Sequence, residues 1–218
     1  MREVFQQELR EVQERLIEIS KLVEVAIQKA TKAFNDSDVS MAESVIADDA
    51  KIDALAAGLD ELAIGILALQ QPVARDLRVV VTALRVSASL ERMGDIAEHI
   101  AQLARYRYPD KVVKKVLRAT FAEMGELDVT VAAKLTELLA TENLEILEQM
   151  RDIDDRIDEL HVSVFDAVLG AAWQGEAVDT VDVTLASRYH ERFADHAISI
   201  AKKVQYLVNG DWPAPGEG

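Results

Sequence analysis

The sequence predicts an all-α protein whose six long helices form two tandem, pseudo-symmetric three-helix bundles. Only 9 glycines and 4 prolines occur among the 218 residues, and so few helix-breaking residues leave room for few turns. Apolar residues recur at steps of three and four over long segments, which is the spacing of one helical face. No segment of strand length alternates apolar and polar residues, so we expect no β-sheet.

Two apolar seams predict the first two helices, and a third helix follows a proline. The first seam has steps of four and three: Phe5, Leu9, Val12, Leu16, Ile19, Val23, Ala26, Ala30 and Ala33. The polar residues 35–38 end this helix, and Ser40 with Glu43 has the spacing of a capping box. The second seam consists of Ile52, Leu55, Leu59, Leu62, Ile66 and Leu69. Residues 70–72 interrupt it, and we expect a third helix over residues 74–105.

The second half of the chain predicts three more helices, over residues 111–139, 142–173 and 178–208. The first of these follows Pro109, and Gly210 is a suitable stop for the last. Trp173 and Phe193 are expected to belong to the apolar core.

The two halves of the chain resemble each other. The segment 90–95 (LERMGD) is repeated at 190–195 (HERFAD), so that Glu91 recurs as Glu191. This repetition predicts two related three-helix units. We place them at residues 1–108 and 109–210, followed by a flexible tail at residues 211–218.

Composition excludes several classes of protein. The chain has 24 Lys and Arg against 39 Asp and Glu, a net charge of −15, which argues against nucleic-acid binding. It has no cysteine, which excludes disulfides, thiolate zinc sites and a cysteine nucleophile. No stretch has the pattern of a signal peptide or the length of a membrane span. We therefore expect a soluble, cytoplasmic protein.

Pairs of acidic residues spaced by four are the candidate functional feature. Glu91 and Asp95 share one helical face, and so do Asp49 and Asp53. If the second and third helices form an antiparallel hairpin about Pro72, residues 53 and 91 come level, as do residues 49 and 95. The second unit repeats this relation about its turn at residues 174–175, with Asp154, Asp158, Glu191 and Asp195.

Two interpretations of these acids stay open. An acidic pair spaced by four is often no more than the solvated face of a helix. However, like charges at this spacing are mildly unfavourable, and the arrangement recurs in both halves, which favours a bound cation. Clustered oxygen ligands suit Mg²⁺, Mn²⁺, Ca²⁺ or iron, and zinc less distinctively. His99, His161 and His196 lie near these positions and are possible additional ligands.

The chain resembles the PhoU family in the segments 72–78 (PVARDLR), 91–95 (ERMGD) and 191–196 (ERFADH). The resemblance implies a cytoplasmic negative regulator of the phosphate-starvation response. Such a protein acts as an adaptor between the ATPase of a phosphate ABC transporter and a phosphate-sensing histidine kinase. It also implies metal ions (iron, zinc, manganese or magnesium) bound by Glu91, Asp95, Glu191 and Asp195, with Asp49, Asp53, Asp154 and Asp158 contributing.

The sequence departs from the family pattern at a few positions. Phe193-Ala194 stands where Ile-Gly is usual, and His99 and Ser199 stand where the family often has Asn. The Phe193-Ala194 departure falls within the motif of the second acidic cluster, so the second cluster matches the family pattern less well than the first. We also expect a homodimer that does not span the membrane.

Two alternatives come from other classes of protein. A ferritin-like di-iron enzyme would need Glu-x-x-His motifs facing a shared core, and only Asp158-x-x-His161 comes near that pattern. A purely structural helical scaffold would bind no metal. Because no nucleophile with a base and an orienting partner is apparent, we expect no catalytic residues and no enzyme.

Overall fold

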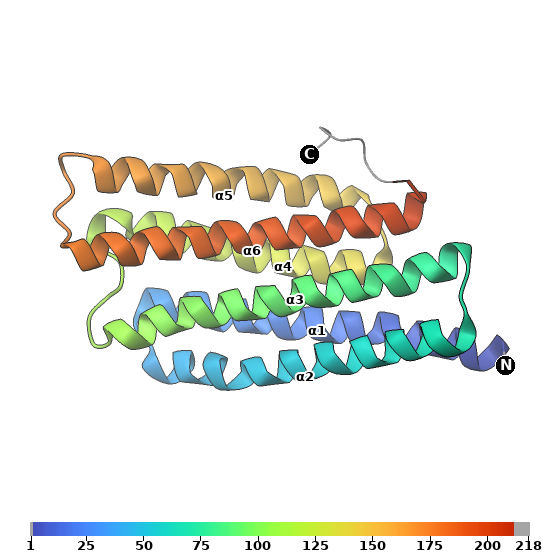
Figure 1. Cartoon of the computed structure of the whole chain (residues 1–218). Coiled ribbons are helices and arrows are strands. Elements are labelled where there is room, and N and C mark those ends of the chain that lie inside the picture. Colours follow the sequence, from blue (N-terminus) through green and yellow to red (C-terminus); the bar gives the residue numbers. More distant parts are fainter. Residues whose placement is uncertain (1, 212–218) are drawn as a thin grey trace.

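The protein folds as a helical bundle, as predicted (Figure 1). The structure, a computed structural model, describes residues 2–211. Its α-helices in this range are α1 (Arg2–Asp36), α2 (Val39–Gln70), α3 (Ala74–Arg107), α4 (Arg118–Thr141), α5 (Glu145–Leu169) and α6 (Ala177–Asn209). A single 3₁₀ turn, η1 (Lys115–Leu117), precedes α4. Most of the expected tail, residues 212–218, lies outside the described residues.

The two three-helix units pack against each other along α1–α4 and α3–α6 (Figure 1). Buried apolar side chains from both units form one continuous core. Across the α1–α4 contact, for example, the rings of Phe34 and Phe121 lie 5.5 Å apart between centroids. The positions of α3 and α6, and of the acidic residues on them, are therefore set by packing between the units as well as within each.

The first predicted seam lies in this core, but the start of α2 differs from the prediction. All nine seam residues of α1 are buried or packed against the core. The N-cap of α2 is Asp38, whose Oδ1 accepts a hydrogen bond from the backbone N–H of Met41 at 3.0 Å. The capping box predicted from Ser40 and Glu43 is therefore wrong, because a carboxylate two residues earlier already caps the helix.

The fourth helix does not begin at residue 111 as predicted, because the segment between α3 and η1 is not helical. Val112 and Val113 are buried, and Lys111 Nζ donates a hydrogen bond to the backbone O of Asn35 at 2.7 Å. These contacts hold the connecting segment against the core and against the end of α1 before α4 begins. The fourth helix therefore begins at Arg118, seven residues later than predicted.

The fifth helix is shorter than predicted at both ends, and the sixth agrees with the prediction. Asn143 Oδ1 accepts a hydrogen bond from the N–H of Glu145, where α5 begins. At the other end α5 stops at Leu169, and Trp173 lies in the following turn with its Nε1 donating to Thr180 Oγ1 at 2.9 Å. Gly210 has φ +85° and ends α6, as expected for a glycine C-cap.

A buried polar pair links α4 to α6. His190 Nδ1 lies 2.6 Å from Asp128 Oδ2, and both side chains are fully buried beside Phe34 and Phe121. Burial raises the pKa of Asp128 to about 6, although the neighbouring His190 acts in the opposite direction. Sequence reasoning did not identify this pair, since the two residues are 62 positions apart.

None of the helices over residues 2–211 combines the length and apolar character that a membrane span requires.

Candidate functional site

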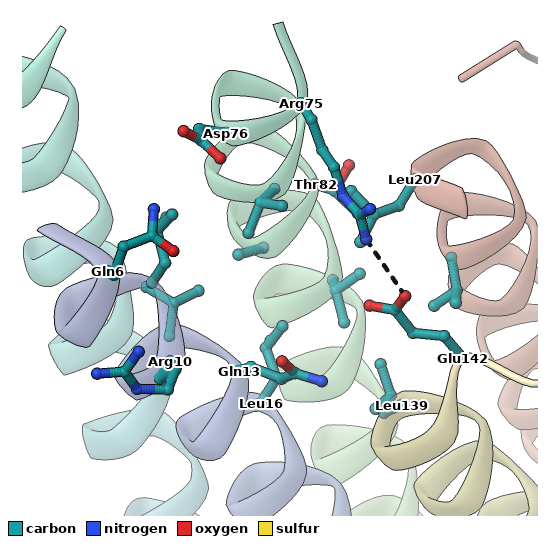
Figure 2. Close-up of a pocket in the computed structure, with 16 residues that line it drawn as sticks. Gln6, Arg10, Gln13, Leu16, Arg75, Asp76, Thr82, Leu139, Glu142 and Leu207 are labelled. Atoms are coloured by element: carbon teal, nitrogen blue, oxygen red, sulfur yellow. Dashed lines mark ion pairs between the residues drawn. The ribbon is translucent and has the colours of Figure 1, made fainter. Parts of the chain in front are cut away.

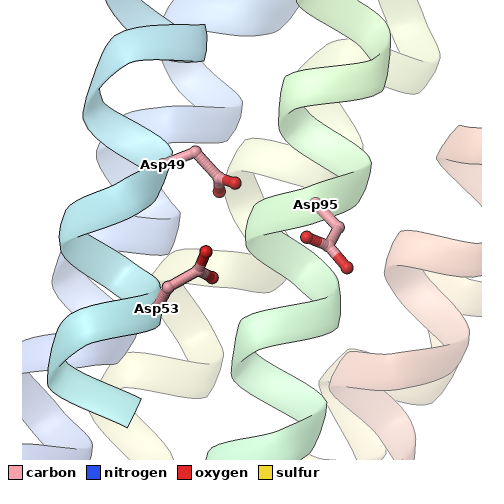
Figure 3. A group of neighbouring side chains, drawn as sticks. All are labelled: Asp49, Asp53 and Asp95. Carbon is pink, nitrogen blue, oxygen red and sulfur yellow. The ribbon is translucent and has the colours of Figure 1, made fainter. Parts of the chain in front are cut away.

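The α2–α3 hairpin brings three of the predicted carboxylates together (Figure 3). Asp49 and Asp53 come from α2 and Asp95 comes from α3, and one oxygen of each lies within 4.8 Å of the others. Within residues 2–211, no other three acidic or histidine side chains converge this closely. This acidic triad lies at the height expected from a hairpin about Pro72.

Gly94 allows the close approach of α2 and α3 beside the triad. A Cβ atom placed on Gly94 would lie 3.0 Å from Asp49 Oδ1 and 3.1 Å from Ile52 Cδ1. Such contacts are tighter than ordinary van der Waals distances, so a larger residue would displace Asp49. The missing side chain is therefore part of the geometry that places Asp49 next to Asp95.

The charges at the triad repel one another. Asp49 is partly buried, and burial is the main cause that raises its pKa to about 6. The negative charges of Asp53, Glu98, Asp95 and Glu91 raise it further, in that order. Glu98 was not among the predicted ligands, although it lies one turn beyond Asp95 on α3. Its spacing of three from Asp95 was the signal that could have identified it.

Glu91 and Arg92 lie at the edge of the triad. Glu91 acts on Asp49 electrostatically but does not belong to the group of converging oxygens. Arg92 Nη1 donates to Asp95 Oδ2 at 2.6 Å, and this hydrogen bond is the main cause that raises the pKa of the arginine. One carboxylate oxygen of Asp95 thus pairs with an exposed arginine, and the other takes no part in that ion pair.

The second unit holds a looser version of the same arrangement. Burial, followed by the charges of Asp158 and Asp195, raises the pKa of Asp154 to about 6. Burial and Asp195 also raise the pKa of Glu191, which accepts a hydrogen bond from Arg188 while its Oε2 is buried without a hydrogen-bond partner. These four acids interact electrostatically, but in the described chain no three of them converge as the triad does.

The residue that corresponds to Gly94 offers a physical reason for this difference. Ala194 occupies the matching position on α6 and is fully buried. It carries the methyl group that, at Gly94, would crowd Asp49 and Ile52. We infer that this methyl group keeps the second cluster wider than the first.

The candidate histidines have other partners. His161 Nδ1 lies 3.0 Å from Ser187 Oγ, and burial lowers the pKa of this histidine. His99 stacks on Tyr189 with 5.2 Å between ring centroids. Burial also lowers the pKa of His196, with Arg192 as the next cause. None of the three belongs to the acidic triad.

The triad is chemically suited to a hard divalent cation. It offers three carboxylates on two rigid helices, and oxygen ligands are those that Mg²⁺, Mn²⁺, Ca²⁺ and ferrous iron accept. Zinc sites more often include nitrogen or sulfur ligands, which this group does not provide. Three carboxylates would leave coordination positions for water or for further acids such as Glu98.

A separate pocket lies where the ends of α1, α3, α4 and α6 meet (Figure 2). Its volume is about 250 Å³, and Val12, Leu16 and Ala83 belong to its apolar floor. An ion pair between Arg75 and Glu142, with 3.6 Å between nitrogen and oxygen, crosses its rim. Because its floor is apolar and its rim carries both signs of charge, this pocket has no donor set like that of the triad.

Comparison with known proteins connects this fold to one family. The family model of the PhoU domain matches residues 16–104 and again 121–204. The chain is 39% identical to "Phosphate-specific transport system accessory protein PhoU homolog 2" of Mycobacterium tuberculosis, over 98% of this chain and 100% of the relative. It is 38% identical to the PhoU homolog 1 of Mycobacterium leprae, over 98% of this chain and 96% of the relative.

Solved structures agree with this relationship. The phosphate transport system regulatory protein PhoU of Streptococcus pneumoniae superimposes with a TM-score of 0.85 at 24% identity, covering 97% of this chain and all of that one. PhoU of Pseudomonas aeruginosa superimposes with a TM-score of 0.83 at 25% identity, covering 95% of this chain and all of that one. The repeated domain, the full-length identity and the shared fold together show that this chain belongs to the PhoU family of phosphate-transport accessory proteins.

Proposed function

We propose that this protein is a cytoplasmic negative regulator of the phosphate-starvation response. Its identity of 39% over nearly the whole length of a phosphate-specific transport accessory protein is the observation that carries the proposal. In this role it is an adaptor between the ATPase of a phosphate ABC transporter and a phosphate-sensing histidine kinase. The net charge of −15 supports docking on basic surfaces of such partners.

A deletion strain tests the regulatory part of the proposal. When phosphate is plentiful, loss of the protein should leave phosphate-starvation genes switched on and should raise phosphate uptake. Reintroducing the wild-type chain should restore repression. Starvation genes that stay repressed in the deletion strain would contradict the regulatory assignment.

A pull-down tests the adaptor role separately. The tagged full-length chain should retain the transporter ATPase and the histidine kinase from cells grown in rich phosphate. The amounts recovered should differ between phosphate-rich and phosphate-starved cells. Failure to recover either partner under both conditions would refute the adaptor role and leave the deletion result unaffected.

We further propose that the acidic motifs hold divalent metal ions. In the first unit Asp49, Asp53 and Asp95 would provide the ligands, with Glu91 beside them. In the second unit the corresponding set is Asp154, Asp158, Glu191 and Asp195. A bound cation would neutralise the mutual repulsion of the carboxylates and connect α2 to α3. The convergence of three carboxylate oxygens supports this proposal for the first unit.

The metal proposal has a direct test in the double variant Glu91→Gln, Asp95→Asn. Metal content of the purified protein should fall while its helicity is retained, because both side chains lie on a polar face outside the core. A cation that binds only the folded state stabilises it, so a chelator should lower the melting temperature of the wild type more than that of the variant. Equal sensitivity to the chelator would refute the metal proposal.

The two alternatives are less well supported. A ferritin-like enzyme is not favoured, since the chain belongs to a family of accessory proteins and three of its four histidines contact serine, tyrosine or a buried aspartate. A metal-free scaffold is the remaining alternative. Elemental analysis of the purified protein separates it from the metal-binding proposal.

A further inference from the structure

The pairing of α3 with α6 has two comparable ends. The two helices lie side by side and run in opposite directions (Figure 1). The internal repeat relates each residue of α3 to the residue of α6 that is 100 positions later, as Glu91 to Glu191. At one end of the pair, the carboxylate of Asp182 is buried and receives hydrogen bonds from Arg107, with 3.0 Å between Nη2 and Oδ1. An internal anion therefore balances the arginine there.

The other end of the pair has no such carboxylate. The residue of α3 that corresponds to Asp182 is Thr82, which is equally buried but uncharged. A pocket of about 260 Å³ lies beside it, lined by Leu77, Arg78, Val81, Thr82, Arg85 and Tyr206. None of the described residues that line this pocket is acidic. Arg78, Thr82 and Arg85 share one face of α3, since they are spaced by four and three.

These arginines are particular to this end of the helix pair. The residues of α6 that correspond to Arg78 and Arg85 are Val178 and Leu185, which are exposed apolar residues. At these two positions of the repeat, α3 therefore carries guanidinium groups and α6 does not. Packing of α3 against α6 does not require arginines at these positions, because the corresponding positions at the other end are Val178 and Leu185.

Arg78 is held in place but lacks a hydrogen-bond partner for its Nε. That nitrogen is buried and unpartnered. The end of α6 lies against the guanidinium group, since a Cβ on Gly210 would be 3.6 Å from Arg78 Nη2. A buried donor without an acceptor is costly, and in native proteins it commonly indicates an absent water, ion or ligand.

A third cation lies close by on α6. Lys203 Nζ donates to the backbone O and to Oγ of Ser199, both of them uncharged acceptors. Burial, followed by the positive charge of Arg85, lowers the pKa of Lys203. Three cationic side chains thus gather at one end of a protein whose net charge is −15. Such a protein repels anions in general, so a retained anion would need a built site.

We propose that a small oxyanion of the phosphate type binds in this pocket. The guanidinium groups of Arg78 and Arg85 donate to its oxygens, because their planar forks match phosphate geometry. Thr82 adds a hydroxyl donor from the pocket wall. Leu77 and Val81 provide an apolar wall for the organic part of a phosphate monoester. The anion therefore comes from one of two sources, free inorganic phosphate or a phosphate monoester.

This inference goes beyond the proposed function and does not depend on it. Calorimetric titration of the purified full-length chain tests it, with inorganic phosphate and phenyl phosphate as probes and chloride used to keep the ionic strength constant. Saturable binding with a Kd on the order of 1 mM or tighter is expected. Arg78→Gln should weaken binding tenfold or more, since a charge-assisted hydrogen bond is lost. Arg78→Lys keeps the positive charge but not the planar guanidinium group, so its affinity should lie between those of the wild type and Arg78→Gln.

A matched control is available at the far end of the bundle. Lys115→Gln removes one positive charge from an exposed residue of η1 and should bind phosphate as the wild type does. Arg85→Gln, at an exposed position of the pocket, should also weaken binding, which guards against a folding defect in the Arg78 variants. Thermal melting in chloride confirms that each variant is folded.

The outcomes separate clearly. Binding of inorganic phosphate that depends on Arg78 supports the site and identifies free phosphate as a source, whereas binding of phenyl phosphate alone supports the site and identifies a monoester. Absence of saturable binding of both probes would overturn the proposal, as would equal loss in Arg78→Gln and Lys115→Gln. The arginines would then serve only to interact with the C-terminal end of α6. Neither result bears on the phenotype of the deletion strain.

Discussion

Asp49→Asn is expected to stabilise the metal-free protein at neutral pH and to reduce its response to divalent cations. Burial and the neighbouring acids raise the pKa of Asp49 from 3.8 to about 6. The folded state therefore binds a proton at this carboxyl more tightly than the unfolded state does. Between about pH 4 and pH 6 the wild type should lose stability as pH rises, because the carboxylate becomes charged in an unfavourable environment.

The expected gain in stability of the Asn variant follows from how far the pKa of Asp49 is raised. At 1.36 kcal/mol for each pH unit, the change from 3.8 to about 6 corresponds to about 3 kcal/mol. Asp49 is only partly buried, so screening by solvent reduces the expected gain for the Asn variant to about 1–2 kcal/mol. In a protein of this size, that gain raises the melting temperature by roughly 2–8 °C.

Thermal melting in a chelator, at neutral pH and near pH 4, provides the assay. The advantage of Asp49→Asn should be present at neutral pH and absent near pH 4, where Asp49 of the wild type is protonated. Added Mn²⁺ or Mg²⁺ should stabilise the wild type more than the variant. A variant that is less stable than the wild type in chelator at neutral pH would refute the reasoning.

The neighbouring residue provides a matched control with the opposite sign. Asp48 Oδ1 accepts a hydrogen bond from Lys51 at 2.7 Å, and Lys29 lies 3.3 Å from its other oxygen. These lysines lower the pKa of Asp48, with Lys51 as the main cause. Asp48→Asn should therefore destabilise the protein slightly, by about 0.2–0.5 kcal/mol, since the pairs are exposed.

Three further predictions follow from other parts of the molecule. Gly94→Ala should displace Asp49 and weaken metal binding several-fold, with a change in the free energy of unfolding under about 1 kcal/mol. The reverse change in the second unit, Ala194→Gly, should bring its acids closer together. Metal titration and thermal melting measure both effects. His190→Ala leaves the carboxyl of Asp128 buried without a partner and should lower the free energy of unfolding in urea by about 3–5 kcal/mol, whereas a loss below about 1 kcal/mol would contradict this. Association with protein partners should slow as salt rises, mainly through the on-rate, because the net charge is −15; a salt-independent rate would exclude electrostatic steering.

Local sequence was sufficient to predict the helices and the hairpin that carries the triad. The spacing of apolar residues and the rarity of glycine and proline are local properties, and helix formation depends on them directly. An antiparallel hairpin about Pro72 also makes residue 49 level with residue 95, and residue 53 level with residue 91, by counting alone. The prediction was wrong at residues 111–117, where the segment that joins the two units packs Val112 and Val113 into the core and α4 begins only at Arg118.

The tertiary structure decided which acids converge. Counting residues from each hairpin turn does not distinguish the triad from the second cluster, since both halves carry acids at the same spacing. The distance between two helices depends on the side chains at their contact, and the first unit has a glycine at position 94 where the second has an alanine at position 194. Counting also placed Glu91 among the ligands, although its oxygens do not belong to the converging group, and it did not identify Glu98, whose charge acts on Asp49.

Contacts between the two units were likewise decided only in three dimensions. The sequence by itself determined an all-α repeat with acidic helix faces, because periodicity and charge can be read one helix at a time. The shared core, the buried pair of Asp128 with His190, and the placement of Arg78 against the end of α6 join residues that are far apart in the chain. Such contacts depend on how the helices pack against one another, and no local pattern in the sequence specifies that packing.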